Sequence, residues 1–138
     1  MATVSMPSDK RRRSADITTN TTLTAADQGI VQVIRSSSAF VTLPSTAASL
    51  TFTFRVGGGV VTSGPQGAAG SAVVLNISPA AADGIGGLGL TTVINKDLIY
   101  TGGAVGEEFT LTASGTAGTA AWYITDAPAT TGTFSKEA

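Results

Sequence analysis

Alternating apolar and polar residues over 50–56 constrain the fold of this chain more than any other feature. The apolar members of the run all fall at even numbers: Leu50, Phe52, Phe54 and Val56. A period of two puts these side chains on one face of a β-strand, and we expect that face to be buried. The apolar run before it, 40–43, stops at Pro44, which lacks the N–H that a continuing central strand needs. We therefore predict two strands within 39–56, paired as antiparallel neighbours.

Short β-like runs recur along the rest of the chain at intervals of about 8 to 14 residues, separated by Gly and Pro. The further strands predicted are 29–36, 73–78, 98–101, 109–113 and 120–125, and the runs 91–95 and 132–135 are candidates for one more short strand. We predict single helical turns at most, at 24–28 and 79–82, and surface connections at 57–72 and 79–89. This pattern predicts an all-β fold, an antiparallel β-sandwich or jelly-roll-like barrel of about 7–8 short strands with an extended N-terminal arm.

The composition favours one domain that covers much of its surface with partners. A chain of 138 residues has the length of one domain. Only 12% of the residues are charged, about half the usual share. A weakly charged surface suits a subunit of an assembly, so we predict an oligomer, with a homotrimer as the expected state.

Residues 1–20 differ from the rest of the chain in charge. They contain four consecutive basic residues and two acidic ones, for a net charge of +2, whereas residues 21–138 carry a net charge of −3. The segment has no apolar period, so we predict a basic extended arm over 1–20 and a β-sandwich domain over 21–138.

The arm has two kinds of side chain with which to bind a partner. We favour a tether in which the basic residues pair with carboxylates and the apolar residues dock in shallow sites. Without interleaved aromatic residues, we do not expect nucleic acid binding, and a merely solvated tail is the other alternative. The predicted arm contacts are Val4, Met6, Lys10, Arg11, Arg12, Arg13 and Ile17.

The residue types exclude most hydrolytic chemistry. The sequence contains no His and no Cys, which removes the usual general base, thiol nucleophile and zinc ligands. Glu107 and Glu108 are adjacent, so on a strand they point to opposite faces and do not share a site. We predict that the chain is not an enzyme and needs no cofactor or metal.

The aromatic residues near the C-terminal end have two possible roles. Trp122 and Tyr123 lie within the predicted strand 120–125, and we assign them to the core or to a trimer contact. A carbohydrate-binding module normally shows several exposed aromatic residues, and here Tyr100, Trp122 and Tyr123 are the candidates.

The sequence shows neither a membrane helix nor a secretory signal, so we predict synthesis in the cytoplasm. No run of about 18 apolar residues occurs, so we expect no membrane helix. The first residues are polar throughout and lack the apolar core of a secretory signal.

Several short motifs resemble small all-β structural proteins of tailed bacteriophages, of the capsid decoration or cement type. The motifs cover roughly residues 22–135 and are VTLP (41–44), LTFTF (50–54), LNISP (75–79), FTLTASG (109–115), AWYI (121–124) and GTF (132–134). The resemblance implies a homotrimeric knob on the outer surface of the virion head that binds the major capsid protein through an N-terminal arm. It implies no catalytic residues. The alternatives are a fibre or tail module that mediates attachment, or a cellular carbohydrate-binding module.

Overall fold

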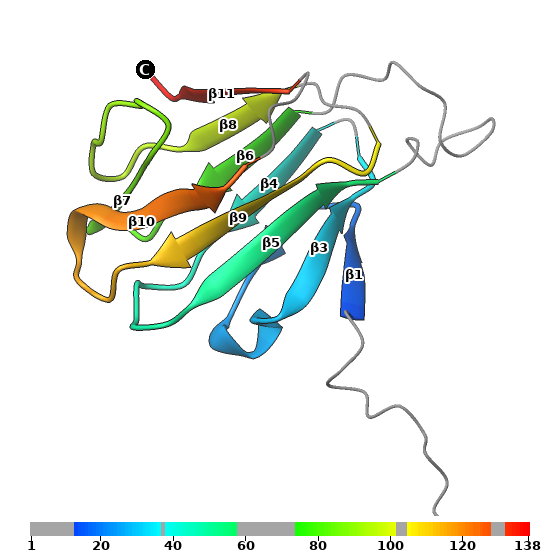
Figure 1. The fold of residues 1–138 in the computed structure, drawn as a ribbon, viewed down its shortest axis with the longest axis horizontal. Helices are drawn as coiled ribbons and strands as arrows, with labels where there is room; N and C mark the ends of the chain where they lie inside the picture. Colours follow the sequence, from blue (N-terminus) through cyan, green and yellow to red (C-terminus); the bar gives the residue numbers. More distant parts are fainter. Residues whose placement is uncertain (1–12, 37, 58–73, 102–104, 128–131) are drawn as a thin grey trace, which may run out of the picture.

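The computed structural model describes residues 13–36, 38–57, 74–101, 105–127 and 132–138. These residues form two β-sheets that pack face to face, so the fold is an all-β sandwich (Figure 1). Sheet A has the order β1-β3-β5-β9-β10-β7 and sheet B the order β11-β8-β6-β4-β2. One short 3-10 helix, η2 (Ala25–Asp27), precedes β3, in agreement with the helical turn predicted at 24–28.

The strand bounds follow the sequence pattern in most places. In sheet A they are β1 (Arg13–Ile17), β3 (Ile30–Ile34), β5 (Thr51–Val56), β7 (Asp83–Gly86), β9 (Glu108–Ala113) and β10 (Gly118–Asp126). In sheet B they are β2 (Thr21–Thr22), β4 (Ser38–Thr42), β6 (Val74–Ser78), β8 (Leu98–Thr101) and β11 (Thr133–Lys136).

The core lies between the sheets, and β5 is central to it. The even-numbered residues of the run 50–56 are all buried, with Phe52 and Phe54 fully so, which confirms the predicted inward face. Phe52 packs against Trp122 of β10 with ring centroids 5.6 Å apart, and Phe54 stacks on Phe109 of β9 at 5.3 Å. Such pairs add about 0.5–1.5 kcal/mol each beyond the burial of their area.

The sheets are mixed, which corrects the prediction of an antiparallel sandwich. β3 and β5 are parallel neighbours, as are β4 and β6. The cause is that the chain changes sheet at each step from β3 to β6. A strand of one sheet thereby serves as the crossover that joins two parallel strands of the other, the role usually taken by a helix.

The predicted hairpin over 39–56 is wrong for the same reason. The chain does turn after Pro44, but β4 belongs to sheet B and β5 to sheet A. Thr46 in this connection fixes the crossing, because its backbone N–H donates to the buried carboxylate of Asp83 at 2.9 Å. Its hydroxyl donates to the carbonyl of Ala121 at 3.0 Å. The turn therefore connects two layers instead of two adjacent strands.

The region 79–95 also differs from the expectation. Residues 83–86, predicted as part of a connection, form β7 at the edge of sheet A beside β10. The candidate strand at 91–95 is reduced to one isolated bridge between Ile94 and Gly84, and 79–82 forms a turn without a helix. The Gly-rich loop predicted at 57–72 lies outside the described residues except for Gly57.

Candidate functional site

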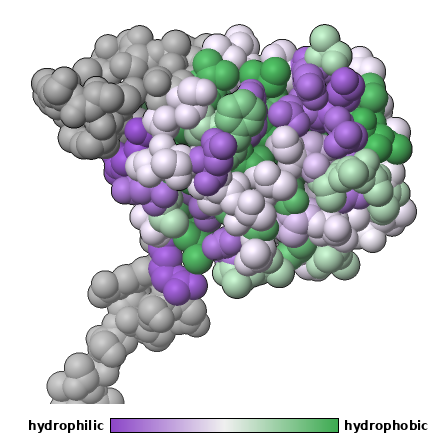
Figure 2. Space-filling model, turned by 180° about the vertical axis from the view of Figure 1, so that it is seen from behind, coloured by the Kyte–Doolittle hydropathy of each residue, from purple (hydrophilic) through white to green (hydrophobic). Residues whose placement is uncertain are grey.

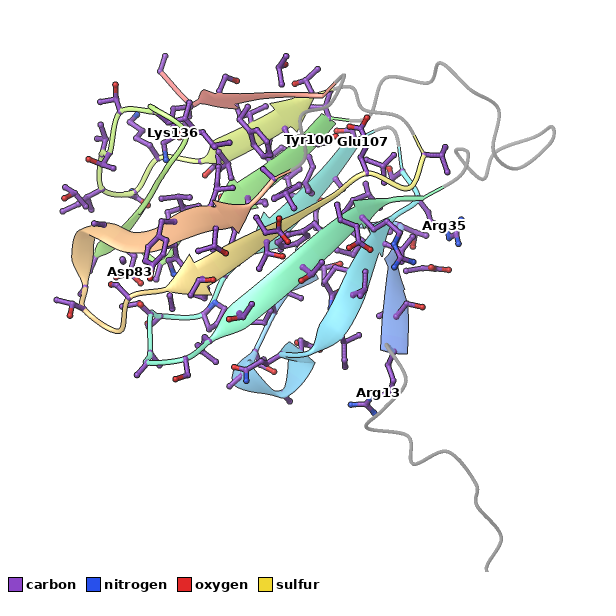
Figure 3. The ribbon with its side chains drawn as sticks, viewed as in Figure 1. Arg13, Arg35, Asp83, Tyr100, Glu107 and Lys136 are labelled. Atoms are coloured by element: carbon purple, nitrogen blue, oxygen red, sulfur yellow. The ribbon has the colours of Figure 1, made fainter. Side chains whose placement is uncertain are left out.

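The N-terminal segment is part of the sandwich from Arg13 onward, which corrects the boundary predicted at residue 20. β1 pairs in parallel with β3 along its whole length at the edge of sheet A. Asp16 of β1 accepts a hydrogen bond from Arg35 Nε at 3.0 Å, and this ion pair joins β1 to the end of β3. Arg13 is exposed at the start of β1 (Figure 3).

The predicted arm residues therefore fall into three groups. Ile17 is 1% exposed and belongs to the hydrophobic core, so its side chain does not reach a partner as proposed from sequence. Arg13 remains accessible. The remaining predicted contacts, Val4, Met6, Lys10, Arg11 and Arg12, lie outside the described residues.

The two aromatic neighbours in β10 point in opposite directions. Trp122 is fully buried against Phe52 and is a core residue, and its Nε1–H has no hydrogen-bond partner. Tyr123 is 39% exposed on the outer face of sheet A. Tyr100 is buried, and its hydroxyl donates to Glu107 at 2.8 Å. Of these three aromatic residues, Tyr123 alone could stack on a sugar ring.

The strands of sheet B place no charged side chain on its outer face, and the carboxylate of Asp97, just before β8, borders this face by accepting a hydrogen bond from the Ser78 hydroxyl at 2.5 Å. Figure 2 shows the molecule from this side, where pale and green residues cover much of the surface and purple residues occur in separate patches. The register places the following residues on this face: Thr22, Ser38, Phe40, Thr42, Val74, Asn76, Ser78, Ile99, Thr101, Thr133 and Ser135. Charged residues are depleted in the same way at the centre of protein interfaces.

Phe40 and Asn76 mark the centre of this face. Phe40 is 45% exposed although it is a large apolar residue. It lies beside Asn76, which lies beside Ile99 on the next strand. Asn76 Oδ1 is buried and accepts no hydrogen bond. Sequence reasoning counted Phe40 in an apolar run, but its outward position follows from the alternation, since Val41 and Leu43 point inward.

The outer face of sheet A is different, because it carries paired charges. Arg55 of β5 donates to Glu108 of the adjacent β9 at 2.6 Å. The hydroxyls of Thr53 and Thr110, the next pair along these strands, hydrogen-bond to each other at 3.1 Å. Glu108 and Glu107 thus bind different partners, as predicted for adjacent residues. An exposed ion pair contributes about 0.2–1 kcal/mol.

A second exposed apolar feature is a hairpin formed by residues 84–94, which we call the Leu88 hairpin. Its tip is a two-residue turn closed by the hydrogen bond from Leu90 N–H to the carbonyl of Gly87 at 3.0 Å. Both central residues have positive φ, 54° at Leu88 and 76° at Gly89, as in a type I′ turn. Leu88 is 61% exposed, and Val93 and Ile94 on the returning side are 41% and 43% exposed.

Leucine is a poor residue for the tip of this turn. Asn or Gly normally occupies the first central position of a type I′ turn. The left-handed backbone conformation costs about 1–2 kcal/mol of conformational free energy for a residue other than Gly, Asn or Asp. The tip thus combines backbone strain with exposure of a large apolar side chain.

Two surface pockets differ in charge. The acidic pocket, of about 510 Å³, is lined by Val105, Gly106, Glu107, Glu108 and Asp126. The neutral pocket, of about 320 Å³, lies where η2 leads into β3 beside the start of β5. The described residues of its lining are uncharged and are Gln28, Gly29, Ile30, Val31, Thr51 and Thr53.

Lys136 bridges the two sheets at the edge where β11 and β7 approach each other (Figure 3). Its Nζ donates to the carbonyl oxygens of Ile85 at 3.1 Å and Lys96 at 2.8 Å. Burial lowers the pKa of Lys136 from its ordinary value of 10.5, and the carboxylates of Asp97 and Glu137 oppose that shift.

This lowered pKa predicts a pH dependence of stability. Because the pKa of Lys136 is lower in the folded state, the unfolded chain holds more protons in the alkaline range below 10.5. The free energy of unfolding contributed by Lys136 should therefore rise with pH in that range. Urea unfolding at several alkaline pH values should show this rise in the wild type and a smaller one in Lys136→Met. Identical pH slopes for the two proteins would contradict the assignment.

The described residues offer no three His, Cys, Asp or Glu side chains placed to share a metal ion. In the same part of the chain, no helix has the length and apolar character needed to cross a membrane. No protein-family model matches the sequence, and a search of curated proteins found no match. The candidate functional surface is therefore defined by its geometry, as the uncharged outer face of sheet B.

Proposed function

We propose that this chain is a virion structural protein of the capsid decoration type. In this role it binds the outer surface of a tailed-bacteriophage head as a homotrimer and stabilises the lattice of the major capsid protein. It is made in the host cytoplasm, catalyses no reaction and uses no cofactor. The resemblance of its short motifs to decoration proteins supports this proposal.

The observation that carries the proposal is the uncharged outer face of sheet B. A sheet face with an exposed Phe40 near its centre and hydroxyl groups around it suits docking on another folded surface. The basic residues before β1 add electrostatic attraction to an acidic partner.

A fibre or tail module is the alternative, because the same face could dock on another tail protein. The location in the particle distinguishes the two functions. A reconstruction of virions produced from the genome that encodes this chain should show the sandwich on the outside of the head. Density in the tail or fibre would favour the alternative, and absence of the chain from purified virions would refute both.

The docking face is tested by one charge placed at its centre. Phe40→Glu should lower attachment to heads by at least about tenfold, because a carboxylate would be buried without a partner. The melting temperature should change little, since Phe40 lies outside the core. Attachment is measured by co-sedimentation of purified protein with heads that lack it.

Tyr123→Glu is the matched control, because Tyr123 is similarly exposed on the opposite face of the sandwich. This variant should attach as the wild type does. Loss of attachment in Tyr123→Glu with retention in Phe40→Glu would assign docking to sheet A and overturn the proposed face.

A further inference from the structure

The short C-terminal strand β11 joins the two sheets along one edge of the sandwich (Figure 1). We propose that β11 is a latch: it holds this edge closed through Phe134 and Lys136, and it opens as a unit while the rest of the sandwich stays folded. Opening uncovers the rings of Tyr100 and Phe109 and loosens β7 on the other sheet. This inference goes beyond attachment to heads, because it concerns the isolated protein and is tested without any capsid.

The first step of the argument is that β11 is weakly held within its own sheet. It is the edge strand of sheet B and pairs with β8. Thr133 and Ser135 are exposed, and Phe134 and Lys136 are half-buried, so no side chain of β11 is fully enclosed. Segments with little buried apolar surface open at a lower free energy than core strands do.

The second step is the aromatic anchor, Phe134. Its ring meets Phe109 of β9 edge to face, with the centroids 5.0 Å apart, and its centroid is also 5.0 Å from that of Tyr100 on β8. The chain enters β11 directly over the Tyr100 ring, since a Cβ at Gly132 would collide with the phenol. One side chain of β11 thus contacts both sheets, and the approach to the strand has room only for glycine unless β11 or Tyr100 moves.

The third step is the polar anchor, Lys136. Its two hydrogen bonds run to the carbonyl oxygens of Ile85 in β7 and of Lys96 just before β8. Both bonds break together when β11 leaves, and the carbonyl of Ile85 then loses this donor. β7 is itself only 4 residues long and lies at the edge of sheet A. Opening of β11 should therefore make β7 easier to open as well.

Native-state hydrogen exchange of the full chain tests whether β11 opens by itself. In the wild type, the backbone amides of β11 should be protected at least roughly a hundredfold less than those of β5. The opening of β11 should depend weakly on urea, because it exposes little surface, whereas β5 should exchange through the urea-sensitive unfolding of the whole domain. Equal protection and equal urea dependence of the two strands would overturn the inference.

A reversible cross-link tests whether β7 responds to the latch. Thr101 and Thr133 lie directly opposite each other on β8 and β11, and the chain has no native Cys. In Thr101→Cys/Thr133→Cys, oxidation should raise the protection of β11 and of β7 at least about tenfold more than that of β5, because the latch is then locked. The reduced form of the same protein is the matched control. If oxidation leaves β7 no better protected relative to β5, the link between the sheets is refuted.

Two substitutions test the anchors themselves. Gly132→Ala places a methyl group against Tyr100, and Lys136→Met removes both hydrogen bonds while keeping an unbranched side chain. Each should lower the protection of β11 at least about tenfold. Lys96→Met is the matched control, because Lys96 Nζ donates to the carbonyl of Ala138 at the exposed C-terminus, and it should leave this protection within about twofold of the wild type. If Lys136→Met exchanges as Lys96→Met does, Lys136 does not hold the latch and the inference fails.

Discussion

Replacing Trp122 with alanine is expected to lower the free energy of unfolding by about 3–5 kcal/mol. Trp122 is fully buried and packs against Phe52, so its removal leaves a cavity between the sheets. Domains of this kind have total stabilities of about 5–15 kcal/mol. The loss is therefore a large part of what holds the sandwich together, and urea unfolding followed by circular dichroism would measure it.

Trp122→Phe should be far milder, because two effects oppose each other. The smaller ring leaves part of the cavity, but it also removes an Nε1–H that is buried without a hydrogen-bond partner. An unpaired buried donor costs about 1–3 kcal/mol. We expect the phenylalanine variant to lie within about 2 kcal/mol of the wild type. If it is as unstable as the alanine variant, then Nε1–H contributes a favourable interaction in the folded state.

The assembly of these variants separates the two roles that the sequence allowed for Trp122. A core residue does not touch a neighbouring subunit, so Trp122→Phe should assemble as the wild type does. Acrylamide should quench the fluorescence of this single tryptophan poorly in the folded protein. Strong quenching in the folded state would contradict its burial.

Local sequence patterns predicted most strands, because the side chains of a strand alternate between its two faces and the apolar ones lie on the buried face. The inward faces of β5 and β9 follow directly from period-two runs that contain Phe52 and Leu111. The pairing of strands could not be predicted in the same way. Whether the turn after Pro44 leads to an adjacent strand or to the opposite sheet depends on distant partners of Thr46, such as the carboxylate of Asp83, 37 positions further along.

The exposed apolar features were missed for a related reason. The Ala- and Gly-rich run that includes Gly86, Gly87 and Gly89 predicted only a connection, whereas close backbone contacts require glycine in part of this hairpin. A Cβ at Gly84 would lie 2.6 Å from the carbonyl oxygen of Thr119. The local sequence signal of a tight turn with an apolar tip is Gly-Leu-Gly at 87–89, and both glycines have positive φ in the structure.

The N-terminal segment joins the sandwich at Arg13, where β1 begins. Deleting residues 1–17 removes β1 and the buried side chain of Ile17, and it exposes the backbone edge of β3. Loss of one buried isoleucine alone costs about 2–5 kcal/mol. We expect this variant to be strongly destabilised, whereas deletion of residues 1–12 should change the free energy of unfolding by less than about 0.5 kcal/mol.

Deletion of residues 1–12 should nevertheless weaken attachment to heads by at least about tenfold, which corresponds to about 1.4 kcal/mol. It removes three basic residues together with Val4 and Met6, so both a salt-sensitive and a salt-insensitive part of the attachment are lost. The matched control replaces Lys10, Arg11 and Arg12 with glutamine in the full chain. This control should bind more weakly than the wild type at low salt and nearly as tightly at high salt, where the charges are already screened. If the deletion variant attaches as tightly as the full chain at both salt concentrations, residues 1–12 are a solvated tail and attachment rests on the sandwich alone.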